Sequence, residues 1–301
     1  MRDLTHLVPL PGGARVAVQE YGAPDGQPVF FFHGWPSSRR MAALADGPAR
    51  ELGLRILSPD RPGIGRSSWQ QDRNLAHWPP LLQALAEHFE APRFRIMAIS
   101  GGAPYAYVAG WALPEQVEAL AVVCGVPPLG DPEVETHLMP LYRWLLGLYR
   151  RRPGGLRWAF RTMRWAGRLR PPPWIRKTLP VPDRETLDDP AAFEICFGSY
   201  SEAWAGATDG VFADASIYAA PWGFSLEAVH VPVHLWHGTE DRNFSPRVAE
   251  RIAQRLPNCR FRLVEGEGHY SLPIRRVREI LEDLAAAPAR ATKGTPSRIE
   301  L

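Results

Sequence analysis

The sequence is poor in the features that mark secreted, membrane-spanning and metal-binding proteins. Its 301 residues include three cysteines, Cys124, Cys196 and Cys259, and this odd, widely spaced set supports neither a disulfide framework nor a zinc site. No apolar run approaches the roughly 18 residues that a membrane-spanning helix needs. The N-terminus also lacks the basic and then apolar pattern of a secretory signal. We therefore expect a protein of the reducing cytoplasm.

Acidic residues are missing from one segment of an otherwise ordinary chain. Residues 143–177 hold 11 arginines and lysines and no acid, which leaves 24 basic and 32 acidic residues elsewhere. The net charge of +3 thus arises from one segment, and no nucleic-acid-reading motif accompanies it, so we expect no nucleic-acid partner. With 45% hydrophobic and 22% charged residues, the composition is that of a globular protein and excludes a disordered chain.

Short apolar runs alternate with helical stretches in the first part of the chain. Near-continuous apolar runs of this kind are typical of parallel strands buried on both faces, and their alternation with helices predicts a doubly wound, mostly parallel α/β sheet. An alternating segment, Arg15–Tyr21, predicts the start of an antiparallel edge. The four runs are Val29–His33, Leu54–Ser58, Phe94–Ser100 and Val117–Cys124, with helices expected at Ser37–Leu52, Asn74–Phe89 and Gly102–Leu113.

The strand pattern stops near Pro128 and resumes about a hundred residues later. It resumes with the strands Val231–His237 and Arg260–Val264 and the helices Pro246–Leu256 and Pro273–Ala287. A gap of this length is far beyond ordinary loops. We therefore predict a core of residues 1–127 and 230–288, a helical cap of residues 128–229 inserted after the sixth strand, and a flexible tail of residues 289–301.

Ser100 lies where a buried strand meets a helix, in the sequence AISGG (98–102). A serine on a sharp strand-to-helix turn can expose its hydroxyl, and small neighbours such as Gly101 and Gly102 allow the strained turn and the close approach of the helix. Binding sites of open α/β sheets lie at the carboxyl ends of strands, where Ser100 is placed.

A loop at the end of an earlier strand can face the space above Ser100. It has the sequence HGWP (33–36), and a backbone N–H of this loop together with the N–H of Gly101 can form an oxyanion hole. We predict that His33 and Gly34 support this loop, and that the His33 side chain holds it in place by hydrogen bonds. The catalytic role belongs to the loop backbone.

Two more loops supply an acid and a base. Asp241 follows the strand Val231–His237 in the sequence GTED (238–241), and His269 follows the strand Arg260–Val264 in GEGH (266–269). Because Ser100, Asp241 and His269 each leave the end of a different strand, all three can converge at one edge of the sheet. Their joint pattern predicts a Ser-His-Asp triad.

These motifs resemble those of capped serine hydrolases of the α/β-hydrolase fold family. The resemblance covers the chain except the expected cap and tail, and it departs from the usual pattern only in Ala98, which replaces the first glycine of the turn. The matching motifs are HGWP (33–36), DRPGIGRS (60–67), AISGG (98–102), GTEDRNFSP (238–246) and GEGH (266–269). The resemblance implies Ser100 as nucleophile, His269 as base and Asp241 as acid, with the N–H groups of Trp35 and Gly101 as the oxyanion hole.

Other residues near the expected acid leave an alternative open. Some members of the family carry the acid after the strand that corresponds to Val117–Cys124, but here the nearest acid, Asp131, lies seven residues beyond Cys124. Asp241 is therefore the better choice, and its neighbour Glu240 remains an alternative. A serine at position 100 argues against the dehalogenase and epoxide hydrolase branches, which use an aspartate nucleophile.

The leading hypothesis is a hydrolase that cleaves a small to medium apolar or aryl carboxylic ester through an acyl-enzyme, with no metal or organic cofactor. Lactonase, carbon–carbon-bond hydrolase, perhydrolase and aminopeptidase activities use the same triad. An aminopeptidase would need cap carboxylates that converge on the substrate's amino group, and Glu194, Glu202 and Asp209 are available. A ligand-binding protein on a hydrolase scaffold is the alternative from another class.

Two further patterns invite interpretation. His230, His234 and His237 lie on or beside one strand, but His237 takes the face opposite to the other two, so we expect no metal site.

The predicted cap helix has a basic face and an apolar one, and several tryptophans accompany it. A solvated arginine face is favoured over an interface with lipid or with anionic substrates. The face consists of Arg157, Arg161, Arg164 and Arg168, opposite Leu156, Phe160, Met163 and Ala166, and the tryptophans are Trp144, Trp158, Trp165 and Trp174.

Overall fold

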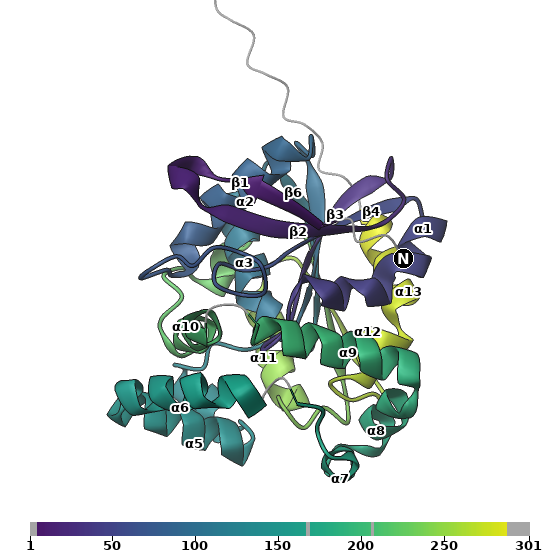
Figure 1. Cartoon of the computed structure of the whole chain (residues 1–301). Coiled ribbons are helices and arrows are strands. Elements are labelled where there is room, and N and C mark those ends of the chain that lie inside the picture. The colour runs from purple at the N-terminus through teal and green to yellow at the C-terminus, as the bar shows by residue number, and fades with distance from the viewer. Residues whose placement is uncertain (1–4, 167–168, 206–207, 288–301) are drawn as a thin grey trace, which may run out of the picture.

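Eight strands form one sheet in this computed structural model, which describes residues 5–166, 169–205 and 208–287 (Figure 1). Their order is β1-β2-β4-β3-β5-β6-β7-β8, with β1 and β2 antiparallel to their neighbours and all other pairs parallel. The mostly parallel sheet is therefore confirmed. The strands are β1 Thr5–Pro9, β2 Arg15–Gly22, β3 Gln27–Phe32, β4 Leu54–Pro59, β5 Phe94–Ile99, β6 Val117–Val123, β7 Val233–Gly238 and β8 Cys259–Val264.

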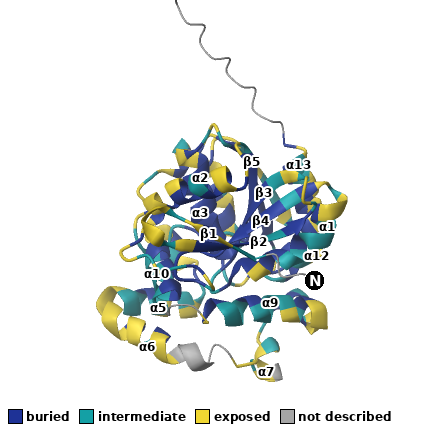
Figure 2. Cartoon of the chain, turned by 45° about the horizontal axis from the view of Figure 1, so that its top comes forward, coloured by how far each residue is buried: buried dark blue, intermediate teal, exposed yellow. Residues whose placement is uncertain are grey.

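The central strands are buried on both faces, as their apolar sequences predict (Figure 2). Alternate residues of β5 enter two different cores: Ile96 packs with α2 and α3 on one face, and Met97 with α1 and α13 on the other. The covering helices are α1 Asp46–Glu51, α2 Trp78–His88, α3 Ala103–Ala112, α11 Pro246–Arg255, α12 Ser271–Arg275 and α13 Val277–Ala285.

Two expected helices and one strand differ in the structure. The helix expected at Pro273–Ala287 is divided into α12 and α13. The segment expected as a helix at Ser37–Leu52 is a 3-10 helix, Arg39–Ala45, followed by α1. Pro48 has no N–H to donate four residues back, so a continuous α-helix through this segment would lose a hydrogen bond. β1 was not expected, because Val8 is its only buried residue and leaves no apolar pattern to recognise.

The chain between β6 and β7 forms helices that lie together at one end of the sheet, below it in the view of Figure 1. We call residues 128–229 the insertion. Its division from the core as a separate domain stays a prediction, and the expected tail lies outside the described residues. Among the described residues, no helix is long and apolar enough to cross a membrane. The insertion's helices are α4 Pro132–Thr136, α5 Pro140–Arg151, α6 Pro153–Ala166, α7 Pro173–Arg176, α8 Val181–Asp188, α9 Pro190–Ala203 and α10 Thr208–Ala219.

Helix α6 has an apolar inner side and a basic outer side over its described side chains. Leu156 and Phe160 are buried, whereas Arg157 and Arg161 are exposed and pair with Asp209 of α10 at 2.9 and 3.0 Å. Contact of this face with lipid stays the less favoured interpretation. Trp144, Trp158 and Trp174 are 62 to 68% exposed, and the side chains of Met163, Arg164, Trp165, Ala166 and Arg168 lie outside the described residues.

Candidate active site

Ser100 occupies a strained turn between β5 and α3. Its backbone has a φ of 50°, in the left-handed region that non-glycine residues rarely adopt. The two residues that follow have no room for a side chain: a Cβ on Gly101 would lie 2.6 Å from the Tyr218 hydroxyl oxygen, and one on Gly102 would lie 2.3 Å from the Phe32 carbonyl oxygen. The small residues of this motif are therefore required by packing, as the sequence indicates.

The structure brings Ser100, His269 and Asp241 together in one hydrogen-bonded chain. The Nε2 atom of His269 lies 3.0 Å from Oγ of Ser100, and its Nδ1 atom lies 2.8 Å from a carboxylate oxygen of Asp241. The other Asp241 oxygen accepts the backbone N–H groups of Asn243 and Phe244, at 2.8 and 3.1 Å. Asp241 is thus fixed at both oxygens, which sets the orientation of the histidine ring. Glu240, the open alternative, is exposed.

The ion pair between Asp241 and His269 sets the pKa of both groups. Burial alone would raise the pKa of Asp241, but the positive charge and hydrogen bond of His269 outweigh burial and hold that pKa below its usual value. Burial alone would lower the pKa of His269, and Asp241 outweighs this effect, so that this pKa lies above 6.5. The pair therefore favours a charged carboxylate and stabilises an imidazolium next to the serine.

The loop after β3 passes directly over the serine. A Cβ on Gly34 would lie 3.5 Å from Cβ of Ser100, and the backbone nitrogen of Trp35 lies 3.1 Å from the place where a Cβ of Gly101 would be. The expected oxyanion donors, the N–H groups of Trp35 and Gly101, are therefore adjacent. His33 contacts the loop through its ring Nδ1, 3.0 Å from the Gly34 carbonyl oxygen, and burial holds the pKa of His33 far below its usual range, which keeps the ring neutral.

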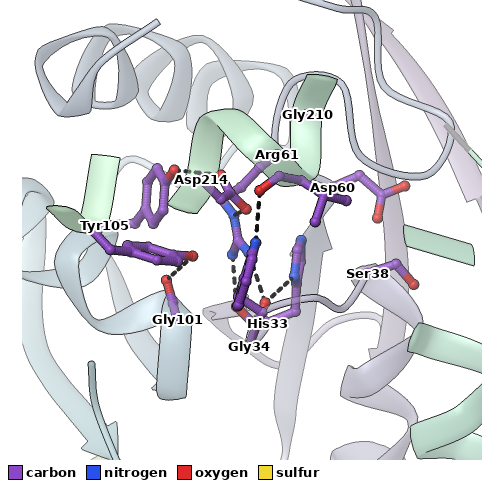
Figure 3. Close-up of polar contacts among 12 residues, drawn as sticks. His33, Gly34, Ser38, Asp60, Arg61, Gly101, Tyr105, Gly210 and Asp214 are labelled. Atoms are coloured by element: carbon purple, nitrogen blue, oxygen red, sulfur yellow. Dashed lines mark hydrogen bonds and ion pairs between the residues drawn. The ribbon is translucent and has the colours of Figure 1, made fainter. Parts of the chain in front are cut away.

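A buried arginine that the sequence interpretation missed holds this loop (Figure 3). Arg61 donates to the carbonyl oxygens of His33 and Gly34, both at 2.7 Å, and to the Asp214 carboxylate of α10 at 2.8 Å. Arg61 belongs to the DRPGIGRS motif, in which the sequence pattern singled out no residue. The signal that could have identified it is its place directly after a buried strand, because a charged residue there needs partners when the loop is covered.

Asp214 is the shared partner of two buried arginines. Besides Arg61 it pairs with Arg73, and it accepts the hydroxyl of Tyr105 at 2.8 Å. Burial alone would raise the pKa of Asp214, but the two guanidinium groups outweigh burial and lower it to about 2. The carboxylate is therefore charged, and it ties helix α10 of the insertion to the loop above Ser100.

An apolar pocket opens above Ser100. It contains about 640 Å³ of atom-free space, including the part open to solvent. Among the residues that the structure describes, no carboxylate or cationic side chain lines it, and most of its wall comes from the insertion. The lining residues are Trp35, Ser100, Val126, Leu129, Tyr142, Leu145, Leu146, Tyr149, Leu156, Phe160, Ala215, Tyr218, Ala219 and Phe244.

The three insertion carboxylates considered for amine recognition lie outside this pocket. Glu194 pairs with Arg170 at 2.6 Å, Glu202 with Arg39 at 2.7 Å, and Asp209 with Arg157 and Arg161 on α6. None of the three is among the pocket-lining residues. The structure therefore does not bring them together near Ser100.

The three histidines around β7 point to different partners. His234 binds Asp283 at 2.7 Å, and the His237 ring contacts the Phe244 carbonyl oxygen at 2.9 Å, while the backbone of His230 accepts from Asn258. Within the described residues, the group whose ligand atoms come within 4.8 Å of one another is Cys124 with Asp241 and His269. Both nitrogens of that histidine are already engaged by Asp241 and Ser100, which leaves neither for a metal.

With its sheet and site described, the chain can be placed among known proteins. A sequence model of the alpha/beta hydrolase family matches residues 29–282, so the chain belongs to this family. A proline iminopeptidase of Lactobacillus helveticus is 23% identical over 81% of this chain and 84% of its own length. The probable oxidoreductase EphD of Mycobacterium tuberculosis is 41% identical over 69 residues, which is 22% of this chain and only 11% of that protein.

Solved structures show the same fold at low sequence identity. A bromoperoxidase from Bacillus anthracis superposes with a TM-score of 0.71 at 17% identity, covering 93% of this chain and 98% of that one. The esterase RhEst1 from Rhodococcus sp. ECU1013 gives a TM-score of 0.69 at 17% identity, covering 95% and 100%. Family and fold together define the protein as an α/β hydrolase.

Proposed function

We propose that this α/β hydrolase is a serine esterase that cleaves a small to medium apolar or aryl carboxylic ester through an acyl-enzyme. The observation that carries the proposal is the hydrogen-bonded chain from Asp241 through His269 to Ser100, which ends in an apolar pocket. A serine hydroxyl is a weak nucleophile at neutral pH, and an adjacent oriented base is what activates it.

In the proposed reaction, Oγ of Ser100 attacks the acyl carbon while His269 takes the hydroxyl proton. The oxygen that becomes negative is stabilised by the N–H groups of Trp35 and Gly101, each worth about 3–4 kcal/mol in comparable sites. His269 then gives its proton to the leaving alcohol as the ester C–O bond breaks. A water molecule, deprotonated by His269, attacks the acyl-enzyme and releases the acid, which restores Ser100.

The pocket supports an uncharged, apolar substrate. It offers aliphatic and aromatic side chains around Ser100, with the hydroxyls of tyrosines as its polar groups, so a charged acyl chain would lose its hydration without compensation. We propose that the insertion acts as a cap here, because its helices α5, α6 and α10 supply most of the wall.

The pairing of the insertion's carboxylates argues against an aminopeptidase. An amino group needs a free carboxylate close to the serine, and Glu194, Glu202 and Asp209 are bound to arginines outside the pocket. Lactonase, carbon–carbon-bond hydrolase and perhydrolase activities use the same triad. Assays with different substrates distinguish them from esterase activity.

A substrate panel tests the proposal. The wild-type protein and the Ser100→Ala variant are assayed with p-nitrophenyl esters of increasing acyl length, a lactone and an amino-acid p-nitroanilide. We expect repeated turnover of the esters by the wild type only. A higher kcat/KM for the lactone or the anilide than for every ester would contradict the proposal, and a single turnover with retained product would favour a ligand-binding protein.

A further inference from the structure

Asp183 is a buried carboxylate of the insertion that reaches the loop carrying His269. It belongs to α8, and it is only 1% exposed. Its two oxygens accept three successive backbone N–H groups, those of His269 at 3.1 Å, Tyr270 at 2.9 Å and Ser271 at 2.8 Å. The insertion therefore binds, through these hydrogen bonds, the backbone of His269, the histidine that contacts Ser100.

The loop is shaped to receive this carboxylate. A Cβ on Gly268 would lie 2.4 Å from an oxygen of Asp183, so only glycine lets the carboxylate approach. The N–H of Gly268 turns away and donates to the Ser271 hydroxyl at 2.7 Å. This contact explains the second glycine of the GEGH motif, Gly268, which has no role in the expected triad or oxyanion hole.

Asp183 differs from the other carboxylates that join the insertion to the core. Asp214 and Glu202 each pair with buried arginines, whereas within the described residues Asp183 makes no ion pair and binds only backbone N–H groups. The contact of Asp183 thus fixes a backbone segment, three successive N–H groups of one loop, where the other two carboxylates fix side chains.

We infer that Asp183 is a positioning residue, which holds the backbone of His269 where its ring reaches both Ser100 and Asp241. The inference rests on the proposed function, because the distances of 3.0 and 2.8 Å from the ring matter for proton transfer. A ring whose Cα moves by about 1 Å loses one or both contacts, and misplacement on this scale costs about 100-fold in rate.

Asp183→Asn is the test variant, because it keeps the size of the side chain and replaces one acceptor oxygen by an NH₂ donor. One or more of the three N–H groups then faces a donor. With the best ester of the panel we expect kcat to fall by about 10- to 100-fold. KM should stay within about twofold, because the pocket-lining residues are untouched.

Two control variants separate positioning from general loss of structure. Asp188→Asn makes the same change on the same helix, at a side chain that is 59% exposed and pairs with Arg176, and it should leave kcat unchanged. Glu202→Gln breaks a different contact between insertion and core, at the Arg39 pair. It should lower the unfolding midpoint and keep kcat. Equal losses of kcat in Asp183→Asn and Glu202→Gln would overturn the inference.

An NMR measurement tests the positioning role of Asp183 independently of the proposed esterase activity. The proton on Nδ1 of His269, shared with Asp241, gives a low-field NMR resonance whether or not the protein hydrolyses esters. We expect this resonance in the wild type and in Asp188→Asn, and its loss in Asp183→Asn. A shift alone does not report movement of the ring, because the charge of Asp183 also acts on the pKa of His269. Absence of ester turnover by the wild type would contradict the proposed function alone. A resonance that persists in Asp183→Asn, shifted or not, would overturn the positioning role.

Discussion

The guanidinium group of Arg61 donates to the carbonyl oxygen of Gly34 at 2.7 Å, and this carbonyl belongs to the same peptide group as the N–H of Trp35. A positive charge at the oxygen polarises the peptide and makes its N–H a stronger donor. A second nitrogen of Arg61 binds the His33 carbonyl, so that two successive peptides of the loop are fixed. Under the proposed function, Arg61 would thus prepare one oxyanion donor before substrate arrives, while Asp214 of the insertion compensates its charge.

Arg61→Lys should lower kcat with little change in KM. A lysine keeps a positive charge for Asp214, but a single ammonium cannot reproduce the planar fork that spans two carbonyl oxygens. We expect a fall of about 10- to 100-fold in kcat, somewhat less than the loss of a whole oxyanion donor. Arg50→Lys, at an exposed pair with Asp46, is the control and should leave the kinetics unchanged. Wild-type kcat in Arg61→Lys would refute the role of Arg61.

Asp214→Asn should destabilise the protein and change its response to acid. Asp214 has a pKa lowered to about 2, so its stabilising contribution is full above the unfolded pKa of about 3.9 and is lost as the pH falls from there towards 2. Removing its charge leaves Arg61 and Arg73 without their shared counter-ion. Loss of one partner of a buried ion pair costs about 3–5 kcal/mol of unfolding free energy.

Urea unfolding at pH 7 and pH 3 measures this effect. Asp214→Asn should be less stable at pH 7 and should lose less stability on acidification than the wild type. Asp209→Asn is the matched control, because Asp209 also has a pKa lowered to about 2 but pairs with exposed arginines. Its loss should stay below about 1 kcal/mol. Equal losses in the two variants would contradict the account of the buried pair.

The pH dependence of ester hydrolysis should report the pair of His269 and Asp241. Because Asp241 holds the pKa of His269 above 6.5, the kcat/KM of the wild type should fall as the pH drops through a value above 6.5. Protonated His269 cannot accept the proton of Ser100. In Asp241→Asn burial is opposed only by the weaker influence of the Asp183 charge on this pKa, so the midpoint should move to lower pH and kcat should fall by about 10⁴-fold.

Glu240→Gln provides the comparison for this profile. Glu240 is exposed, and it is the acid that the sequence left as an alternative to Asp241. Its removal should change neither the midpoint nor kcat. A shift of the midpoint in Glu240→Gln rather than in Asp241→Asn would reassign the acid of the triad.

Leu146→Trp should narrow the substrate range. Leu146 of α5 is buried and lines the pocket, so a larger side chain there takes space from the acyl group. We expect KM for long-chain esters to rise at least about tenfold with short-chain esters little affected, alongside a loss of about 1–3 kcal/mol from overpacking. Leu141→Trp, on the same helix but 53% exposed, should leave the chain-length profile unchanged.

Periodicity and turn chemistry are enough to predict the sheet, except β1, and the three loops that carry Ser100, Asp241 and His269. Buried parallel strands have continuous apolar sequences, and Ser100 and Asp241 lie in the loops after two such strands, β5 and β7, whereas His269 lies in the loop after β8, a partly exposed edge strand. The parallel topology then places the three loops at one edge of the sheet. Local sequence therefore contains most of the information that brings Ser100, Asp241 and His269 together.

Contacts between the insertion and the core could not be predicted in the same way. Asp183 and Asp214 lie 86 and 153 residues from His269 and Arg61, in helices whose orientation no periodicity specifies. A lone aspartate in a polar helical segment has the same sequence appearance whether it faces solvent or a catalytic loop. Only the packed structure shows that these two carboxylates are buried.

Labelling with a fluorophosphonate tests the central claim most directly, because this reagent bonds covalently to a serine that an adjacent base has activated. The wild type, Ser100→Ala and His269→Ala are treated, and the modified residue is mapped by mass spectrometry. We predict stoichiometric modification of Ser100 in the wild type and none in either variant. Modification of a different residue, or an unlabelled but folded wild type, would contradict the assignment of Ser100 as the nucleophile.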